Sequence, residues 1–429
     1  MKSFFYYSFL YSSSSIVVKI LGFFLFLWIA KDVSVTDYGI FGLLYAIQTG
    51  ITTFSIAGIN EVIIGKVKQY KSFNKMRLLF AKSLILFFFL SVLIVLVMIL
   101  LYFFSSKISP DYTFLIVVIT GILLGFTTLQ SQMLRLQEQH NDALSFHALV
   151  PLFGFLFAIV FFYFDKNIGS YFIGQLFGII SIIVVAVINK KAMITFRMDK
   201  NIKLTINSLF PFLFIALLGW MSGYGNNLII NKLFAVEDVA KFTFLMTIAS
   251  TIQLVASSLN MVWSPKFYNM VHTMQIGYVE QQNKFFYTIQ SLCLGVFSAL
   301  ILILFPMIFV YFNDLTVYSH SSFELMFLFL GYILLPIWWH CSNYYLSFNM
   351  GKELRDIVII TSIIGIFLWI LLMHICGEIG IYIGFFVQML VRSFWIYIQS
   401  KKHWKLNVSY EGIFIGLFIT YFSYFATIG

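Results

Sequence analysis

Residues 78–104 read LLFAKSLILFFFLSVLIVLVMILLYFF, and this stretch decides the fold class. Its only charged residue is Lys82, which lies near one end. A helix of about 20 mainly apolar residues crosses the hydrocarbon core of a bilayer. The stretch therefore predicts a transmembrane helix.

Similar apolar runs fill most of the chain. The 429 residues are 61% hydrophobic and only 10% charged, whereas soluble proteins are about 25% charged. We predict thirteen spans, near residues 8–30, 39–64, 78–104, 113–136, 143–164, 168–189, 207–231, 242–265, 285–312, 323–348, 357–376, 379–399 and 410–428. The sequence thus predicts an all-α integral membrane protein. The net charge of +10 does not indicate a nucleic-acid partner, because most basic residues lie in short clusters between apolar runs.

The basic residues also predict the orientation. They concentrate in alternate loops, with the largest groups in residues 66–77, 190–203 and 401–405. Cytoplasmic loops of membrane proteins carry an excess of Lys and Arg. We therefore expect a multi-pass membrane protein with its N-terminus in the cytoplasm.

An internal repeat predicts the domain organisation. The segment KDVSVTDYGIF at 31–41 follows the first span, and KLFAVEDVAKF at 232–242 follows the seventh, with Lys, Val, Asp and Phe in register. The sixth span begins with IGSY at 168–171 and the twelfth with IGIY at 379–382. Parallel repeats of this kind recur in secondary transporters. We predict two six-helix bundles related by a parallel pseudo-two-fold axis, formed by residues 1–195 and 196–405, and an additional C-terminal transmembrane helix in residues 406–429.

Polar residues are unevenly distributed among the spans. Spans 1, 2, 7 and 8 carry polar stripes at helical spacing, whereas spans 3, 5 and 9 nearly lack polar residues. These four spans occupy equivalent places in the two halves, which predicts a polar cleft between the halves. The candidate cleft residues are Ser15, Gln48, Thr52, Ser222, Asn226, Asn227, Asn231 and Thr251. For each residue the alternative is that a small polar side chain only binds helices together.

Charged residues inside the spans are the sharpest candidates. Lys19 and Arg392 both lie deep in a predicted span, where a cation costs roughly 2.5–3.5 kcal/mol or more. Water, a carboxylate partner, snorkelling or an anionic ligand must offset that cost. Glu61, at the cytoplasmic end of the second span, is the candidate group for coupling to H⁺ or Na⁺, and the alternative is an ordinary interfacial charge near Lys66.

No pattern predicts an enzyme, a cofactor or a metal site. Phosphate-binding loops and His-Glu-x-x-His motifs are absent, and no extramembrane region is long enough for an enzyme domain. Cys293, Cys341 and Cys376 lie within apolar runs and are expected to be small buried hydrophobic residues. The scattered His147, His340 and His374 are expected to be structural.

Several short motifs together resemble a known family. They are DYG at 37–39, GIN at 58–60, FP at 210–211, NNLII at 226–230 and WSPKFY at 263–268. In this order and spacing the chain is similar to the polysaccharide-transporter branch of the multidrug/oligosaccharidyl-lipid/polysaccharide (MOP) exporter superfamily, which includes the MATE exporters. The closest type is the O-antigen or capsule repeat-unit flippase (Wzx type). Many relatives carry an acidic-basic pair where this chain has Asn226 and Asn227, and the thirteenth span departs from the usual twelve.

The resemblance implies a function. The protein would move undecaprenyl-pyrophosphate-linked oligosaccharide from the cytoplasmic to the outer leaflet of the bacterial cytoplasmic (inner) membrane by alternating access. Lys19 and Arg392 would then bind the pyrophosphate, and the polar residues would bind the sugars. The expected partners are the lipid bilayer, a polysaccharide polymerase and a chain-length regulator. The alternatives are a cation-coupled multidrug or small-molecule exporter of the same superfamily, a peptidoglycan-precursor flippase, and a membrane-embedded polymerase or glycosyltransferase.

Overall fold

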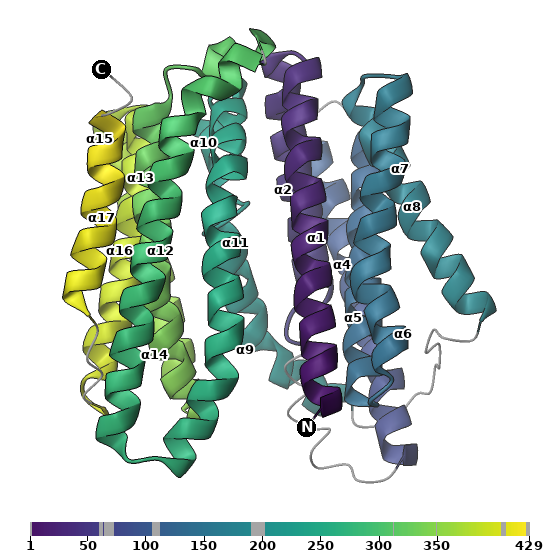
Figure 1. The fold of residues 1–429 in the computed structure, drawn as a ribbon. Helices are drawn as coiled ribbons and strands as arrows, with labels where there is room; N and C mark the ends of the chain where they lie inside the picture. The colour runs from purple at the N-terminus through teal and green to yellow at the C-terminus, as the bar shows by residue number, and fades with distance from the viewer. Residues whose placement is uncertain are drawn as a thin grey trace. The chain divides into compact units, whose positions relative to one another are not determined.

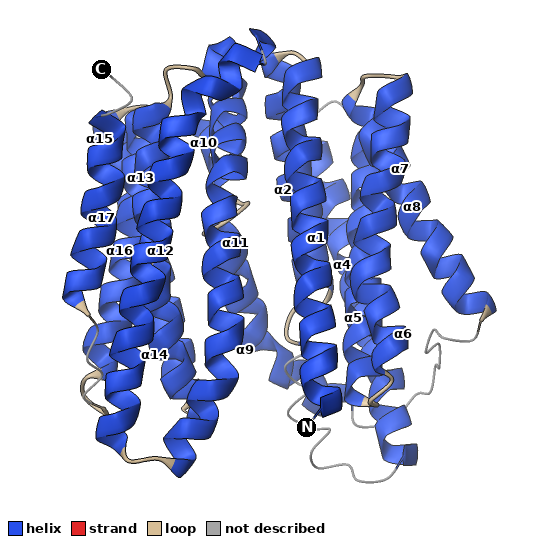
Figure 2. Cartoon of the chain, in the orientation of Figure 1, coloured by secondary structure: helices blue, strands red, loops and turns tan. Residues whose placement is uncertain are grey.

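The computed structural model is helical in every regular element that it describes. It describes residues 2–59, 63, 73–104, 112–189, 202–311, 313–348, 350–404 and 409–425. Within these ranges there is no β-strand (Figure 2). The predicted all-α fold class is therefore confirmed.

The helices follow the predicted spans closely. The N-terminal elements are α1 (Lys2–Asp32), α2 (Val35–Ser55), α4 (Phe73–Phe104), α5 (Tyr112–Leu136), α6 (His140–Leu144), the π-helical turn η1 (Ser145–Leu149), α7 (Val150–Phe164), α8 (Ile168–Ile188) and α9 (Ile202–Met221). The remaining elements are α10 (Asn226–Leu233), α11 (Val236–Thr273), α12 (Ile276–Tyr311), the 3₁₀ turn η2 (Asn313–Tyr318), α13 (Ser322–Ile333), α14 (Leu335–Ser347), α15 (Gly351–Cys376), α16 (Ile379–Ser400) and α17 (Tyr410–Phe425). Each of the thirteen predicted spans overlaps a helix or a pair of consecutive helices.

Most of these helices are able to cross a bilayer. Among the described residues, ten helices are long and apolar enough, or eleven if α9 and α10 form one bent span. α17 is shorter, with 16 described helical residues. The protein is therefore a multi-pass membrane protein.

The chain forms two compact units. The N-terminal unit comprises residues 1–29 and 33–229, and the C-terminal unit comprises residues 30–32 and 230–429. The chain passes from one unit to the other inside α10, so α9 belongs to the N-terminal unit. The division of the repeat at residues 195 and 196 stays a prediction.

Close helix packing organises the N-terminal unit. α7 and α8 run side by side as a hairpin (Figure 1). A Cβ atom added at Gly178 would lie 2.3 Å from the carbonyl oxygen of Phe153, and one at Gly174 would lie 2.5 Å from that of Phe157. Small residues allow such close approach between membrane helices, where dispersion rather than the hydrophobic effect drives packing.

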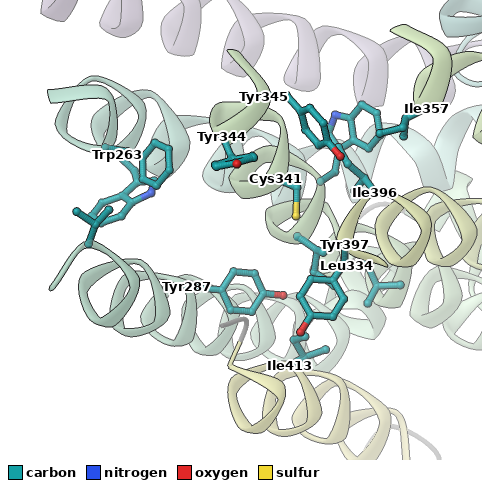
Figure 3. Close-up of a cluster of buried hydrophobic side chains, with 14 of the residues drawn as sticks. Trp263, Tyr287, Leu334, Cys341, Tyr344, Tyr345, Ile357, Ile396, Tyr397 and Ile413 are labelled. Carbon is teal, nitrogen blue, oxygen red and sulfur yellow. The ribbon is translucent and has the colours of Figure 1, made fainter. Parts of the chain in front are cut away.

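An aromatic core holds the C-terminal unit together. α11, α12, α14 and α16 contribute Trp263, Tyr287, Cys341 and Tyr397, whose side chains lie around one another in Figure 3. Trp263 is only 2% exposed and Cys341 is fully buried. Two polar residues of α14 contact this cluster: His340 through Trp263 and Asn343 through Tyr268.

The thirteenth predicted span is an integral part of the C-terminal unit. α17 packs along α12 (Figure 1), and a Cβ atom added at Gly295 would lie 2.7 Å from the Cα atom of Gly416. At the end of α16, the ammonium of Lys401 donates a hydrogen bond of 3.3 Å to Tyr410. Hydrogen bonds to Tyr397 and Tyr410 raise the pKa of Lys401, so this tie keeps its charge at neutral pH.

The two halves repeat the same helix start. Ser34 and Ala235, which are equivalent in the repeat, are the N-cap residues of α2 and α11. The carboxylate of Asp37 accepts a 2.7 Å hydrogen bond from the Ser34 hydroxyl, and that of Asp238 accepts a 3.0 Å bond from the Ala235 amide. At α11 the Asp238 carboxylate thus satisfies a backbone donor, whereas at α2 the Ser34 hydroxyl does so by accepting a 3.1 Å bond from the Asp37 amide. The register read from the sequence therefore holds residue by residue at both turns.

The internal repeat is also seen in the packing of aromatic side chains. Phe41 of α2 contacts Tyr171 of α8 with ring centroids 5.1 Å apart, and the equivalent Phe242 of α11 contacts Tyr382 of α16 at 6.0 Å. Both tyrosines are at most 1% exposed. Equivalent helices thus pack through equivalent aromatic residues in each unit.

An ion pair agrees with the predicted alternation of the spans. Lys241, near the start of α11, lies 2.6 Å from the carboxylate of Glu324, near the start of α13. With the N-terminus in the cytoplasm, the predicted spans 242–265 and 323–348 both begin on the outer side, which is where these two residues lie in the chain. Their contact places the two helix starts at the same end of the C-terminal unit.

The expectation for two cysteines was wrong. Cys341 is buried, but Cys293 and Cys376 are exposed. An apolar run predicts burial in a soluble protein, whereas a membrane helix can turn apolar residues toward lipid. Hydrophobicity alone therefore did not distinguish the two environments.

Candidate functional site

The seventh predicted span is broken in its middle. α9 ends at Met221, α10 begins at Asn226, and the two helices are bent by 53°. Gly225 permits the break, because a Cβ atom there would lie 2.8 Å from the Cα atom of Met221. Non-helical backbone at membrane depth is tolerated only where protein or a water-filled cavity covers it, and such breaks commonly form binding sites in transporters.

α2 supports both sides of this break. The indole of Trp220 donates a 3.0 Å hydrogen bond to the Ala46 carbonyl, and the amide of Asn227 donates a 2.9 Å bond to the Gly42 carbonyl. All four residues belong to the N-terminal unit. The break is therefore a built feature of that unit.

Asn226 is the exceptional residue of the break. Its side chain is fully buried, and within the described part of the chain neither its amide nitrogen nor its amide oxygen has a hydrogen-bond partner. A buried polar group without a partner costs about 1–3 kcal/mol. The two unused amide atoms, which lie at the break between α9 and α10, point to a polar ligand.

Two other candidates of the N-terminal unit already have partners. The Gln48 amide donates a 2.8 Å hydrogen bond to Gln175 of α8, and the Thr52 hydroxyl lies 3.0 Å from the Gly121 carbonyl of α5. These contacts fit the alternative in which a polar side chain only binds neighbouring helices together. Their role in a substrate cleft stays a prediction.

The remaining polar candidates are placed as follows. The hydroxyls of Ser222 and Thr251 donate to carbonyls of their own helices, at 2.8 Å and 2.7 Å. Asn231 and Lys19 are exposed, and Glu61 lies outside the described residues. The structure thus brings Ser222, Asn226 and Asn227 together at one break.

Sequence analysis missed a polar chain around His147. The hydroxyl of Ser15 on α1 lies 2.9 Å from Nε2 of His147, and a guanidinium nitrogen of Arg135 lies 3.0 Å from Nδ1. The Arg135 guanidinium donates to Nδ1, so the ring of His147 is neutral and donates from Nε2 to the Ser15 hydroxyl. His147 lies in the π-helical turn η1, and such turns are frequent at functional sites. No sequence signal marked that turn.

Arg392 is the charged candidate of the C-terminal unit. Its guanidinium carbon lies 4.0 Å from the centroid of the Trp338 ring. Its Nε atom is buried without a hydrogen-bond partner, and none of the ion pairs found in the described ranges includes it. A cation–π contact offsets only about 2 kcal/mol of the cost of burying a cation. Arg392 is therefore suited to an anion.

Comparison with solved structures defines the class of fold. The chain resembles an inward-facing multidrug resistance MATE family transporter of the MOP superfamily, with 15% identity, a TM-score of 0.70 and coverage of 90% of this chain and 95% of that one. The lipid II flippase MurJ in an inward closed conformation gives 15% identity, a TM-score of 0.72 and 98% coverage of both chains. A Vibrio cholerae MATE transporter gives 13% identity, a TM-score of 0.61 and coverage of 94% and 96%. The chain therefore has the MOP-type fold that its sequence predicted.

The family follows from the sequence match. A family model described as polysaccharide biosynthesis protein matches residues 7–271, which is more than half of the chain. The chain belongs to this polysaccharide biosynthesis protein family. Among curated protein sequences, none matches it significantly.

Proposed function

We propose that the protein is a flippase, not an enzyme. It would carry an undecaprenyl-pyrophosphate-linked oligosaccharide from the cytoplasmic to the outer leaflet of the bacterial inner membrane, for O-antigen or capsule synthesis. Family membership and the MOP-type fold support a transporter of lipid-linked sugars. Pyrophosphate and sugar hydroxyls cannot enter hydrocarbon without compensating partners, so a protein path is required.

Arg392 is the observation that carries the proposal. A guanidinium stays charged in proteins and binds phosphate oxygens with two parallel hydrogen bonds. Arg392 lies in a helix able to span the membrane, and its only contact among the described residues that compensates charge is the Trp338 ring. A pyrophosphate supplies the missing negative charge. Lys19 is proposed as a second cation on α1, where its exposed side chain is accessible.

Asn226 has the chemistry to recognise the sugar part of the substrate. An amide offers both a donor and an acceptor, which matches a sugar hydroxyl. Both of these atoms are unused in Asn226. We therefore assign sugar recognition to the helix break of the N-terminal unit and pyrophosphate recognition to Arg392.

Replacing Arg392 tests the proposal. Arg392→Gln should reduce flipping at least tenfold in proteoliposomes loaded with lipid-linked oligosaccharide, or about 1.4 kcal/mol, and Arg392→Lys should retain part of it. The matched control is Arg355→Gln, because Arg355 is exposed and paired with Asp356 at 2.8 Å. Normal flipping by a stably expressed Arg392→Gln protein would remove the pyrophosphate role.

The MATE-like fold favours one competing function, export of a small molecule. An exporter of organic cations would bind them better once a repelling guanidinium is removed. Arg392→Gln would then increase drug resistance or dye efflux while leaving surface glycan unchanged. That result would replace the flippase assignment by the exporter. We keep Glu61 as the proposed group for coupling to H⁺ or Na⁺, and a polymerase and a chain-length regulator as proposed partners.

A further inference from the structure

His340 is buried in the core of the C-terminal unit. It lies on α14 and is 1% exposed. Its Nδ1 lies 2.5 Å from the side-chain oxygen of Asn283, and its Nε2 lies 3.1 Å from the side-chain oxygen of Gln290. Both partners are on α12 and are at most 2% exposed. The ring therefore faces two amide groups and has no access to water.

The orientation of Gln290 is fixed by a backbone partner. Its amide nitrogen donates a 3.2 Å hydrogen bond to the carbonyl of Ala256 on α11. Turning the amide over would place an oxygen against that carbonyl, and two acceptors cannot bond. The oxygen of Gln290 must therefore face Nε2 of His340.

The orientation of Asn283 is fixed in the same way. The indole of Trp263 on α11 donates a 3.2 Å hydrogen bond to the Asn283 oxygen, and an indole nitrogen is only a donor. Turning this amide over would oppose two donors. The oxygen of Asn283 must therefore face Nδ1 of His340.

Two acceptors on one imidazole require two protons. Neutral histidine carries one N–H group, whereas the imidazolium carries two. A neutral ring would set a lone pair against an amide oxygen and lose one of the two bonds. The hydrogen-bond pattern around His340 is thus complete only when the ring is positively charged.

Aromatic rings surround this charge. Trp263 is nearly parallel to the His340 ring with centroids 5.9 Å apart, and the rings of Phe286 and Tyr287 lie at 6.0 Å and 5.3 Å. Figure 3 shows Tyr287 near Cys341, the residue after His340, with Trp263 farther away in the same cluster. Aromatic faces attract cations even without water.

Charged and titratable residues on the surrounding helices do not supply the hydrogen-bond partners of His340. On the helices packed around α14 they include Lys266, Tyr268 and His272 of α11, Glu280, Lys284 and Tyr287 of α12, Glu324 and Tyr332 of α13, Glu353, Arg355 and Asp356 of α15, and Arg392 and Tyr397 of α16; Cys341, Tyr344 and Tyr345 lie on α14 itself. In the described part of the chain, none of them hydrogen-bonds to His340. Glu324 instead pairs with Lys241.

We propose that His340 is a buried proton-binding site that ties α11, α12 and α14 together when it carries the proton. Release of the proton breaks the bond to either Asn283 or Gln290 and loosens the tie. A proton thereby selects between two packings of the C-terminal unit, which is what a coupling or pH-sensing site requires. This inference stands independently of the flippase assignment.

The protonation state of the His340 ring can be measured directly. Nitrogen NMR of histidine-labelled full-length protein in lipid nanodiscs distinguishes the imidazolium from the two neutral tautomers, and the His340→Gln protein assigns the signal. We expect a doubly protonated ring on the acid side that loses one proton in a single step as pH rises to about 8, the upper end of the ordinary histidine range. A single neutral tautomer at every pH at which the protein stays folded would overturn the proposal.

Matched variants then test the tie. Gln290→Leu removes the Nε2 acceptor and should lower the proton affinity of His340 at least tenfold, whereas Asn283→Asp adds a negative charge and should raise it. The control is His374→Gln, because His374 is exposed and contacts only the Ile370 carbonyl of its own helix. An unchanged His340 titration in both partner variants would also overturn the proposal. Because the signal does not depend on transport, the outcome is separable from that of the Arg392 experiment.

Discussion

Two buried asparagines show how differently the units use the same side chain. In the C-terminal unit, Asn343 donates a 3.0 Å hydrogen bond to Asn260 and accepts bonds of 3.2 Å and 3.1 Å from Ser264 and Tyr268. In the N-terminal unit, Asn226 has no partner within the described residues. Both side chains are at most 4% exposed.

The difference separates structure from function. A buried polar group that is fully hydrogen-bonded stabilises the fold, whereas one left without partners costs stability and persists only where something else requires it. Asn343 binds α14 to α11. Asn226 instead keeps a donor and an acceptor free at the break of the seventh span. The same substitution should therefore have opposite consequences at the two positions.

The largest effect on stability is expected for Asn343→Leu. It removes three hydrogen bonds, to Asn260, Ser264 and Tyr268, although Ser264 keeps its 2.8 Å bond to the Asn260 carbonyl. At about 1 kcal/mol per hydrogen bond, the free energy of unfolding should fall by about 3 kcal/mol. Thermal unfolding in detergent and the amount of protein in the membrane measure this loss. Unchanged stability would mean that the hydrogen bonds of Asn343 do not bind the helices together.

Asn226→Leu should act on transport rather than on stability. Removing two unsatisfied atoms leaves the free energy of unfolding unchanged or raises it, while flipping falls about tenfold, or about 1.4 kcal/mol. Surface glycan measured at equal protein level gives the transport effect. Asn226→Gln, which keeps both hydrogen-bonding atoms, is the matched control and should retain more activity. A large loss of stability in Asn226→Leu would make Asn226 another structural asparagine.

Much of this fold was readable from the sequence. The bilayer imposes a minimum length on each span, so apolar runs located the helices, although α11 and α12 begin at residues 236 and 276, ahead of the predicted 242 and 285. The repeat placed Ser34 and Ala235 at equivalent caps. Charged residues were equally informative, since Lys241 and Glu324 were assigned to one side and form an ion pair. These features depend on local pattern and on charge, which a single sequence contains.

The site was less predictable because it depends on which way each helix turns. Lipid and protein interior are both apolar, so the pattern around Gln48 did not reveal that its partner is Gln175, 127 residues away. For the same reason His340 was expected to be merely structural, although its two fixed amide partners define its chemistry. Orientation of side chains at long range is the information that the sequence lacks.

The smallest expected effect concerns the two equivalent helix caps. Asp37→Ala and Asp238→Ala each remove a carboxylate from the first turn of α2 or α11, where it accepts from the Ser34 hydroxyl or the Ala235 amide. Loss of a carboxylate at such a position costs about 0.5–1 kcal/mol. Asp37 is exposed and Asp238 is half-buried, so Asp238→Ala should lie at the upper end of this range. Thermal unfolding of the two variants side by side measures the difference. If the repeat governs local stability, the two losses agree within about 0.5 kcal/mol, as expected for independent sites of the same chemistry. A loss several times larger at one position would mean that one carboxylate has a further role, and that the two halves share a structure but not the same local stability.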